Sequence, residues 1–108
     1  MSPEDAYEAM VQSLIDDDPR ISRANMFGMP TLKINGKAFA GFFDDALIVK
    51  LGVERVQQLL KGKGAREADP SGMGRPMKEW VMIDQPKSAA KKKWRTFAEE
   101  AKVFVSKG

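Results

Sequence analysis

Residues 26–51 read MFGMPTLKINGKAFAGFFDDALIVKL, and this stretch decides the fold of the chain. Asn35-Gly36 is a pair whose tolerance of positive φ at both positions suits a type I′ turn, and apolar residues alternate on either side of it. The pattern therefore predicts a β-hairpin that pairs Ile34 with Lys37 and Leu32 with Phe39.

The second turn of this stretch can be predicted from packing. A two-residue loop at Asp44-Asp45 would put the large residues of the third strand on the face opposite those of the hairpin, so both faces would be apolar. A loop of residues 44–46 pairs Phe43 with Leu47 and brings these side chains to one face. We therefore predict a helix-covered face of Leu32, Ile34, Phe39, Phe43, Leu47, Val49 and Leu51. The opposite face then carries Thr31, Lys33, Ala38, Ala40, Phe42, Ile48 and Lys50.

Three helices and two more strands are predicted around this meander. Pro3 suits the first position of a helix, and Pro19 prevents that helix from continuing. Trp94 and Phe97 lie on the apolar stripe of a long final helix and should anchor it. The expected elements are a helix from residue 3 to before residue 19, a helix over 53–60, an edge strand over 65–68, a strand over 77–83 and a helix from about residue 87.

The expected fold class is therefore α+β. We predict a two-layer domain whose five-stranded antiparallel sheet is backed by helices, in the order α-β-β-β-α-β-β-α. The chain has 108 residues, of which 43% are hydrophobic, and this fits a single domain over residues 1–108.

Composition excludes several kinds of chemistry. The chain contains no cysteine and no histidine, so disulfides, thiolate metal sites and the usual Ser-His-Asp or Cys-His nucleophile systems cannot be built. We therefore expect no enzyme activity, no catalytic residues, no cofactor and no metal. No apolar run approaches the ~20 residues of a membrane span, and the acidic N-terminus is unlike a signal peptide. A cytoplasmic protein with no membrane contact is expected.

One candidate partner surface lies on the predicted open face of the sheet. Phe42 and Ile48 would form an apolar strip there, flanked by Lys33 and Lys50. Large apolar side chains next to each other on a surface often mark an interface. We therefore expect a protein partner or a second copy of the chain on this strip, unless a helix or loop covers it.

A second candidate surface is basic. Residues 61–108 hold twelve basic and six acidic side chains, whereas residues 1–60 hold six basic and nine acidic. On the last helix the cations follow one flank of the apolar stripe and should face solvent, namely Lys91, Lys92, Arg95 and Lys102. This basic patch is the candidate contact for nucleic acid, which we rank below a protein partner because the net charge is only +3.

Three other features of the sequence are candidate binding sites for a metal ion, a phosphate group or a small molecule. Residues 16–18 are three consecutive aspartates, which without the spacing of a calcium loop should simply face water. Residues 72–75, Gly-Met-Gly-Arg, precede a strand and fit a plain turn better than a phosphate loop. The alternative function is a small-molecule pocket between sheet and helices, lined by Trp80, Trp94 and methionines.

Five short motifs in order resemble the TfoX N-terminal domain family. They are Met26-Phe27-Gly28, the Asn35-Gly36-Lys37 turn with Phe39-Ala40, residues 47–51, Glu54-Arg55, and residues 75–81 with the sequence RPMKEWV. The resemblance covers about residues 20–105. It implies an α+β domain with an antiparallel sheet backed by helices, as in the wider set of secretion-chaperone-like folds.

The resemblance also implies a class of function. Longer TfoX (Sxy) proteins are bacterial regulators of competence genes that act with the cyclic-AMP receptor protein and carry a second, helical domain. This sequence ends at Gly108, so it is expected to be the stand-alone form. The implied function is a non-catalytic regulatory or interaction module, related to transcription through protein or protein–DNA contacts, and the family offers no catalytic residues to carry over.

Overall fold

The computed structural model describes residues 3–26, 29–43, 45–62, 64–68, 78–84 and 90–107, with the side chains of all but residues 3, 26 and 90–93. In these ranges the chain forms three helices and six strands, in the order α1-β1-β2-β3-β4-α2-β5-β6-α3. The helices are α1 (Pro3–Asp17), α2 (Val53–Leu60) and α3 (Ala90–Lys107). The strands are β1 (Ile21–Met26), β2 (Met29–Ile34), β3 (Lys37–Phe43), β4 (Ala46–Lys50), β5 (Ala65–Glu67) and β6 (Trp80–Asp84).

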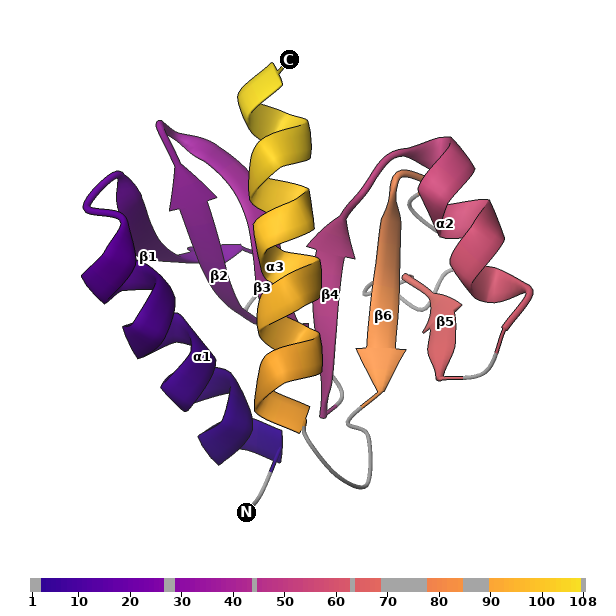
Figure 1. The fold of residues 1–108 in the computed structure, drawn as a ribbon, viewed down its shortest axis with the longest axis horizontal. Helices are drawn as coiled ribbons and strands as arrows, with labels where there is room; N and C mark the ends of the chain where they lie inside the picture. The colour runs from indigo at the N-terminus through magenta and orange to yellow at the C-terminus, as the bar shows by residue number, and fades with distance from the viewer. Residues whose placement is uncertain are drawn as a thin grey trace.

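The strands form one antiparallel sheet, in the order β1-β2-β3-β4-β6-β5. Helices α1 and α3 lie side by side over one face of it, and α2 packs beside β5 and β6 (Figure 1). Buried residues of all three helices, such as Leu14, Val56 and Trp94, belong to one core with that face of the sheet. The predicted α+β class, with helices backing an antiparallel sheet, is therefore confirmed.

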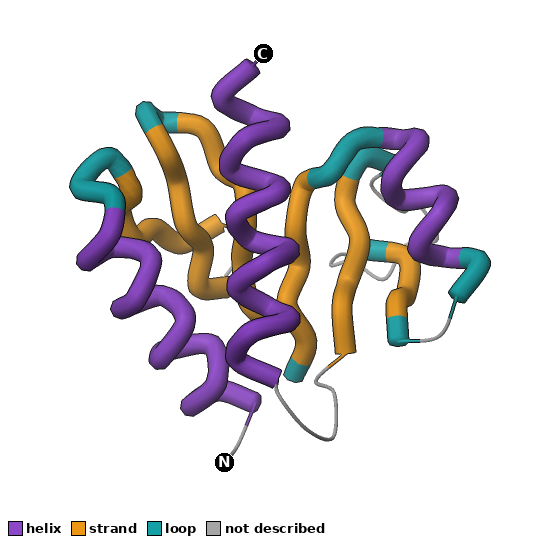
Figure 2. The backbone as a smooth tube through the Cα atoms, viewed as in Figure 1, coloured by secondary structure: helices purple, strands orange, loops and turns teal. Residues whose placement is uncertain are grey.

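Most predicted elements appear where the local signals put them. The helix predicted over residues 53–60 is α2, the edge strand is β5, and the chain turns tightly between β2 and β3 (Figure 2). Trp94 is fully buried and Phe97 is 9% exposed, so both anchor α3 as expected. The strand predicted over residues 77–83 is β6, but it begins only at Trp80, because Lys78 and Glu79 lie in a turn. The predicted start of the last helix near residue 87, the turn at 72–75 and residue 77 lie outside the described residues.

The prediction of five strands is wrong, because β1 adds a sixth. Residues 21–26 read ISRANM and offer little apolar alternation, and Ser22, Arg23 and Asn25 are exposed. The strand forms at the sheet edge through its ladder with β2, from the pair Ile21 and Ile34 to the pair Met26 and Met29. Its stability therefore comes from backbone pairing with a neighbour more than from its own side chains.

The first hairpin has the predicted turn but a different register. Asn35 and Gly36 have φ of 51° and 80°, as a type I′ turn requires, and Ile34 pairs with Lys37. Leu32 faces Ala40, however, and not Phe39. The register shifts by one residue here, so Phe39 is the extra residue of a β-bulge.

The second loop is also shorter than predicted. Phe43 pairs with Ala46, which leaves only residues 44 and 45 between the strands, and Asp45 adopts a φ of 58°. The three-residue loop is therefore wrong. The chain inserts its extra residue at the bulge, and this one-residue shift moves the following side chains to the other face.

The bulge decides which aromatic residue the helices cover. Six of the seven residues predicted for the helix-covered face belong to the core beneath the helices, and Phe43 is the exception. Phe42 takes the place predicted for Phe43, with its ring centroid 5.2 Å from Tyr7 and 6.3 Å from Trp94. Ala40 also lies in this core, contrary to the prediction.

A second, smaller core lies on the opposite face of the sheet. Its buried members are Met29, Ala46, Ile48, Ala68 and Met82, with Phe43 and Trp80 packed against them. The sheet is thus apolar on both faces, and the second face is not simply exposed to water. This arrangement removes the open surface on which the first candidate site depended.

Candidate functional site

The predicted partner strip does not form. Phe42 lies under the helices, and Ile48 is fully buried in the second core. Lys33 and Lys50 are partly exposed, and Phe42 is partly buried against the main core. The physical reason is the bulge at Phe39, which turns Phe42 inward, together with the burial of the second sheet face.

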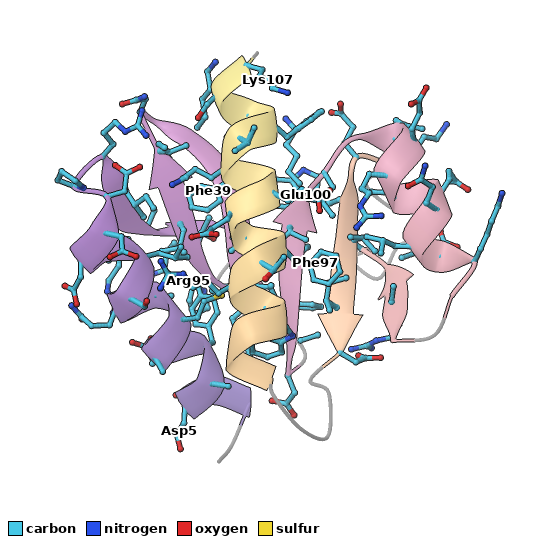
Figure 3. All side chains as sticks on the ribbon, viewed as in Figure 1. Asp5, Phe39, Arg95, Phe97, Glu100 and Lys107 are labelled. Atoms are coloured by element: carbon cyan, nitrogen blue, oxygen red, sulfur yellow. The ribbon has the colours of Figure 1, made fainter. Side chains whose placement is uncertain are left out.

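The predicted basic patch is not a row of cations in solvent. Arg95 hydrogen-bonds Ser13 and Asp17 on α1, and its Nε lies 3.2 Å from Oε1 of Glu99 (Figure 3). Lys102 Nζ lies 3.3 Å from Oδ2 of Asp18. Both cations therefore join α3 to α1. The side chains of the other two predicted members, Lys91 and Lys92, lie outside the described residues.

Asp18, the residue that follows α1, pairs with both Arg20 and Lys102. The Arg20 guanidinium donates to both of its carboxylate oxygens, at 2.9 and 2.8 Å, and the Arg20 backbone N–H donates at 3.0 Å. These bonds, with a smaller contribution from Lys102, hold the pKa of Asp18 well below its usual range. The aspartates at residues 17 and 18 thus pair with cations, contrary to the expectation that they simply face water. Within the described residues, no group of three or more acidic side chains could hold a metal ion.

The described residues form a groove of about 700 Å³ at the surface. It lies where the C-terminal end of α3 passes the start of β3, the end of β4 and the start of β6. We call it the α3-end groove. Its lining consists of Lys37, Ala38, Lys50, Glu79, Trp80, Phe104, Val105 and Lys107.

The sheet register builds the floor of the α3-end groove. Lys50 and Trp80 are direct partners across β4 and β6. The backbone N–H groups of Leu51 and Gly52 donate to the Glu79 carbonyl oxygen at 2.9 and 3.1 Å. These bonds fix the end of β4 against the residue before β6, so the floor is held by backbone hydrogen bonds.

Phe104 and Glu79 line both the α3-end groove and a second hollow of about 410 Å³. The second hollow reaches the start of α2 and is lined in part by Gly52, Val53 and Arg55. Phe104 is 36% exposed and Val53 is 47% exposed, although both are large apolar residues. The Phe104 ring therefore offers apolar surface to both hollows.

Gly52 allows the Phe104 ring to lie this close to the backbone. Its φ is 92°, in the region that favours glycine, and a Cβ built there would be 2.8 Å from Cε1 of Phe104. The ring thus rests on the backbone that leads into α2. The position of this exposed aromatic side chain is set by the main chain.

The charge of the α3-end groove is mainly positive. The lining contains the lysines Lys37, Lys50 and Lys107 and one carboxylate, Glu79. Lys50 Nζ lies 3.9 Å from Oε2 of Glu79, and the two side chains are 32% and 49% exposed. A pair this long and this exposed to water is weak. The groove can therefore bind an anionic group while its apolar floor accepts an uncharged one.

The predicted pocket between sheet and helices, lined by both tryptophans, does not form in the described part of the chain. Trp80 lines the α3-end groove, whereas Trp94 is fully buried in the main core and its Nε1 donates to the Asp84 carbonyl oxygen at 3.4 Å. Phe104 and Lys107 were missed as site residues. The available signal was the run of three consecutive apolar residues at 103–105, since three successive positions span more of a helix circumference than one apolar stripe covers.

Comparison of the chain with protein-family models, with curated proteins and with solved structures finds no match. Among the described residues, no helix is long and apolar enough to cross a membrane. The α3-end groove and the sequence motifs are therefore the features that point to a function.

Proposed function

We propose that this protein is a non-catalytic interaction module of the kind represented by the TfoX N-terminal domain, and that it binds a partner protein at the α3-end groove. One observation carries the proposal, namely the exposed Phe104 ring, which lines both hollows and rests against Gly52. Exposed aromatic side chains beside concave apolar surface are typical of binding sites for proteins.

The charge distribution supports a protein partner over nucleic acid. Arg95 forms an ion pair with Asp17, and Lys102 forms one with Asp18. The flank of α3 therefore offers fewer cations for phosphates than the sequence predicts. The α3-end groove combines lysines with a glutamate and an apolar floor, which suits protein better than a uniformly charged backbone. A role in transcription, acting in the cytoplasm, would then be exerted through the partner.

Photo-crosslinking in cells that naturally make the protein tests this function. A benzoylphenylalanine replaces Phe104 in one variant and Gln12, an exposed residue of α1, in the control. We expect one discrete crosslinked protein from position 104 and none from position 12. Crosslinks from neither position, or from position 12 alone, would refute the proposal that the groove is the partner site.

A second candidate function is the binding of a small molecule in the same groove. Its volume of about 700 Å³ falls within the ~300–1,000 Å³ range of ligand pockets. Four of its eight lining residues are exposed, however, and a small ligand would be poorly enclosed. A thermal-shift screen of metabolites separates the two functions, since a ligand that binds the folded state raises the melting temperature and a protein-only site gives no hit.

A further inference from the structure

We infer that the occupant of the α3-end groove is an acidic peptide segment of the partner that carries an apolar anchor side chain. This inference rests on the proposed function and specifies its ligand.

The charge of the groove favours carboxylates. Three lysines and one glutamate line it, so the lining carries an excess of positive charge. Other ion pairs of the described residues are shorter, such as Arg23 with Glu8 at 3.0 Å and Arg66 with Asp84 at 2.8 Å. The 3.9 Å separation of Lys50 and Glu79 is loose by comparison, and a carboxylate of the ligand can replace Glu79 as the partner of Lys50.

The floor of the groove favours an apolar anchor between those carboxylates. The apolar residues of the lining are Ala38, Trp80, Phe104 and Val105. Trp80 is only partly buried, and Phe104 is 36% exposed, so a bound side chain would remove apolar surface from water on both sides of itself. A ligand that carried only charged groups would leave the apolar surface of the groove exposed to water.

The same features argue against nucleic acid. A phosphate backbone would bring continuous negative charge against Glu79 in this groove and Glu54 in the neighbouring hollow. A short acidic segment can place its carboxylates at the lysines and its anchor at the floor. The peptide therefore matches the alternation of charge and apolar surface better than a polyanion does.

The test is a selection of short random peptides on the immobilised full chain, followed by fluorescence anisotropy with the synthetic peptides that emerge. We expect selected peptides with Asp or Glu on both sides of an aromatic or large aliphatic residue. Lys107→Glu should weaken their binding about threefold or more, because a favourable charge becomes repulsive. Lys61→Glu is the matched control, since Lys61 is an exposed lysine at the C-terminal end of α2 and lines neither hollow.

A second pair of variants tests whether the peptide binds through an apolar anchor. Phe104→Ala should weaken binding about tenfold, as truncation of a central anchor does. Val103→Ala is the control, because Val103 is also an exposed apolar residue of α3 but lines neither hollow. Should Phe104→Ala fail to fold, Lys107→Glu still decides the matter, since it alters an exposed side chain at the helix end.

Several outcomes would overturn the inference. These are selected peptides without acidic residues, equal binding by the wild type and Lys107→Glu, or competition by duplex DNA at physiological salt. A concentration-dependent dimer that Lys107→Glu abolishes would assign the groove to a second copy of the chain instead. A crosslinked partner from position 104 together with a failed peptide selection would reject the acidic peptide and leave the proposed function standing. Absence of any crosslink would instead reject the function itself.

Discussion

Replacing Trp94 by alanine should remove a large part of the stability of this protein. The side chain is fully buried, and its ring lies edge-on to Phe42 with centroids 6.3 Å apart. A buried tryptophan removes about 150–250 Å² from water, which at about 25 cal/mol per Å² corresponds to about 4–6 kcal/mol. Retention of the alanine methyl group and partial relaxation of the cavity reduce this, so we expect a loss of about 3–5 kcal/mol.

The free energy of unfolding can be measured by urea denaturation, followed by far-ultraviolet circular dichroism because the substitution also removes a fluorophore. The matched control is Trp80→Ala, which deletes the same side chain from a partly exposed position and should lose about 1–2 kcal/mol. Trp94→Phe should lie between the two, since it can keep the contact with Phe42 but loses the hydrogen bond to the Asp84 carbonyl oxygen. A loss below about 1 kcal/mol for Trp94→Ala would refute the burial of this residue and make it a binding residue instead.

Three further predictions concern single positions. Gly52→Ala should lose about 2–4 kcal/mol in urea denaturation, through the positive φ and the overlap with Phe104, whereas Gly36→Ala, which has a positive φ but open space around it, should lose only about 1–2 kcal/mol. Gly41→Ala should lose about 1–3 kcal/mol because its Cβ would lie 2.9 Å from a backbone oxygen of β2, and an unchanged urea midpoint would contradict that approach. Asp18→Asn should destabilise the protein at neutral pH but have little effect in acid. The pKa of Asp18 is lowered in the folded state, so the carboxylate stabilises the fold above its ordinary pKa of 3.8 and that contribution is lost as the pH falls further. An equal difference between the wild type and Asp18→Asn at both pH values would contradict the ion pairs.

Local backbone signals predicted most of the elements. The Asn35-Gly36 turn, the limits set by Pro3 and Pro19 and the extent of α2 depend on the φ values that individual residues allow, and these act within a few positions. Strand β1 has no such signal. Its pairing depends on β2, and a sequence pattern within residues 21–26 does not record what its neighbour offers.

Two errors in the predicted register cancel over most of the sheet. The prediction placed one extra residue in the loop after Phe43, whereas the protein places it at the bulge at Phe39. Between these two points every side chain lies on the face opposite to the predicted one. For this reason the predicted faces of Ala40, Phe42 and Phe43 are wrong. Beyond Phe43 both versions agree, so Leu47 and Val49 face the helices as predicted.

The predicted basic patch failed for a tertiary reason. The helical pattern correctly put Arg95 and Lys102 beside the apolar stripe of α3, because that depends only on helix geometry. It could not reveal that the acidic end of α1 lies along the same flank and pairs with both cations. Charge on one side of a helix therefore predicts exposure only where no second helix lies alongside.

The position of the candidate site follows from a mismatch of lengths. Helix α3 has 18 residues, roughly 27 Å at the rise of an α-helix, whereas β4 and β6 have five residues each, roughly 17 Å as extended strands. Helix α3 runs along β4 and projects past its end (Figure 1). Val105 is still buried in the main core, whereas Phe104 lies against Gly52, beyond the end of β4, and is partly exposed. A helix that extends past the strand it follows thus leaves a partly exposed apolar side chain near its end, and on this basis we place the partner site at the end of α3.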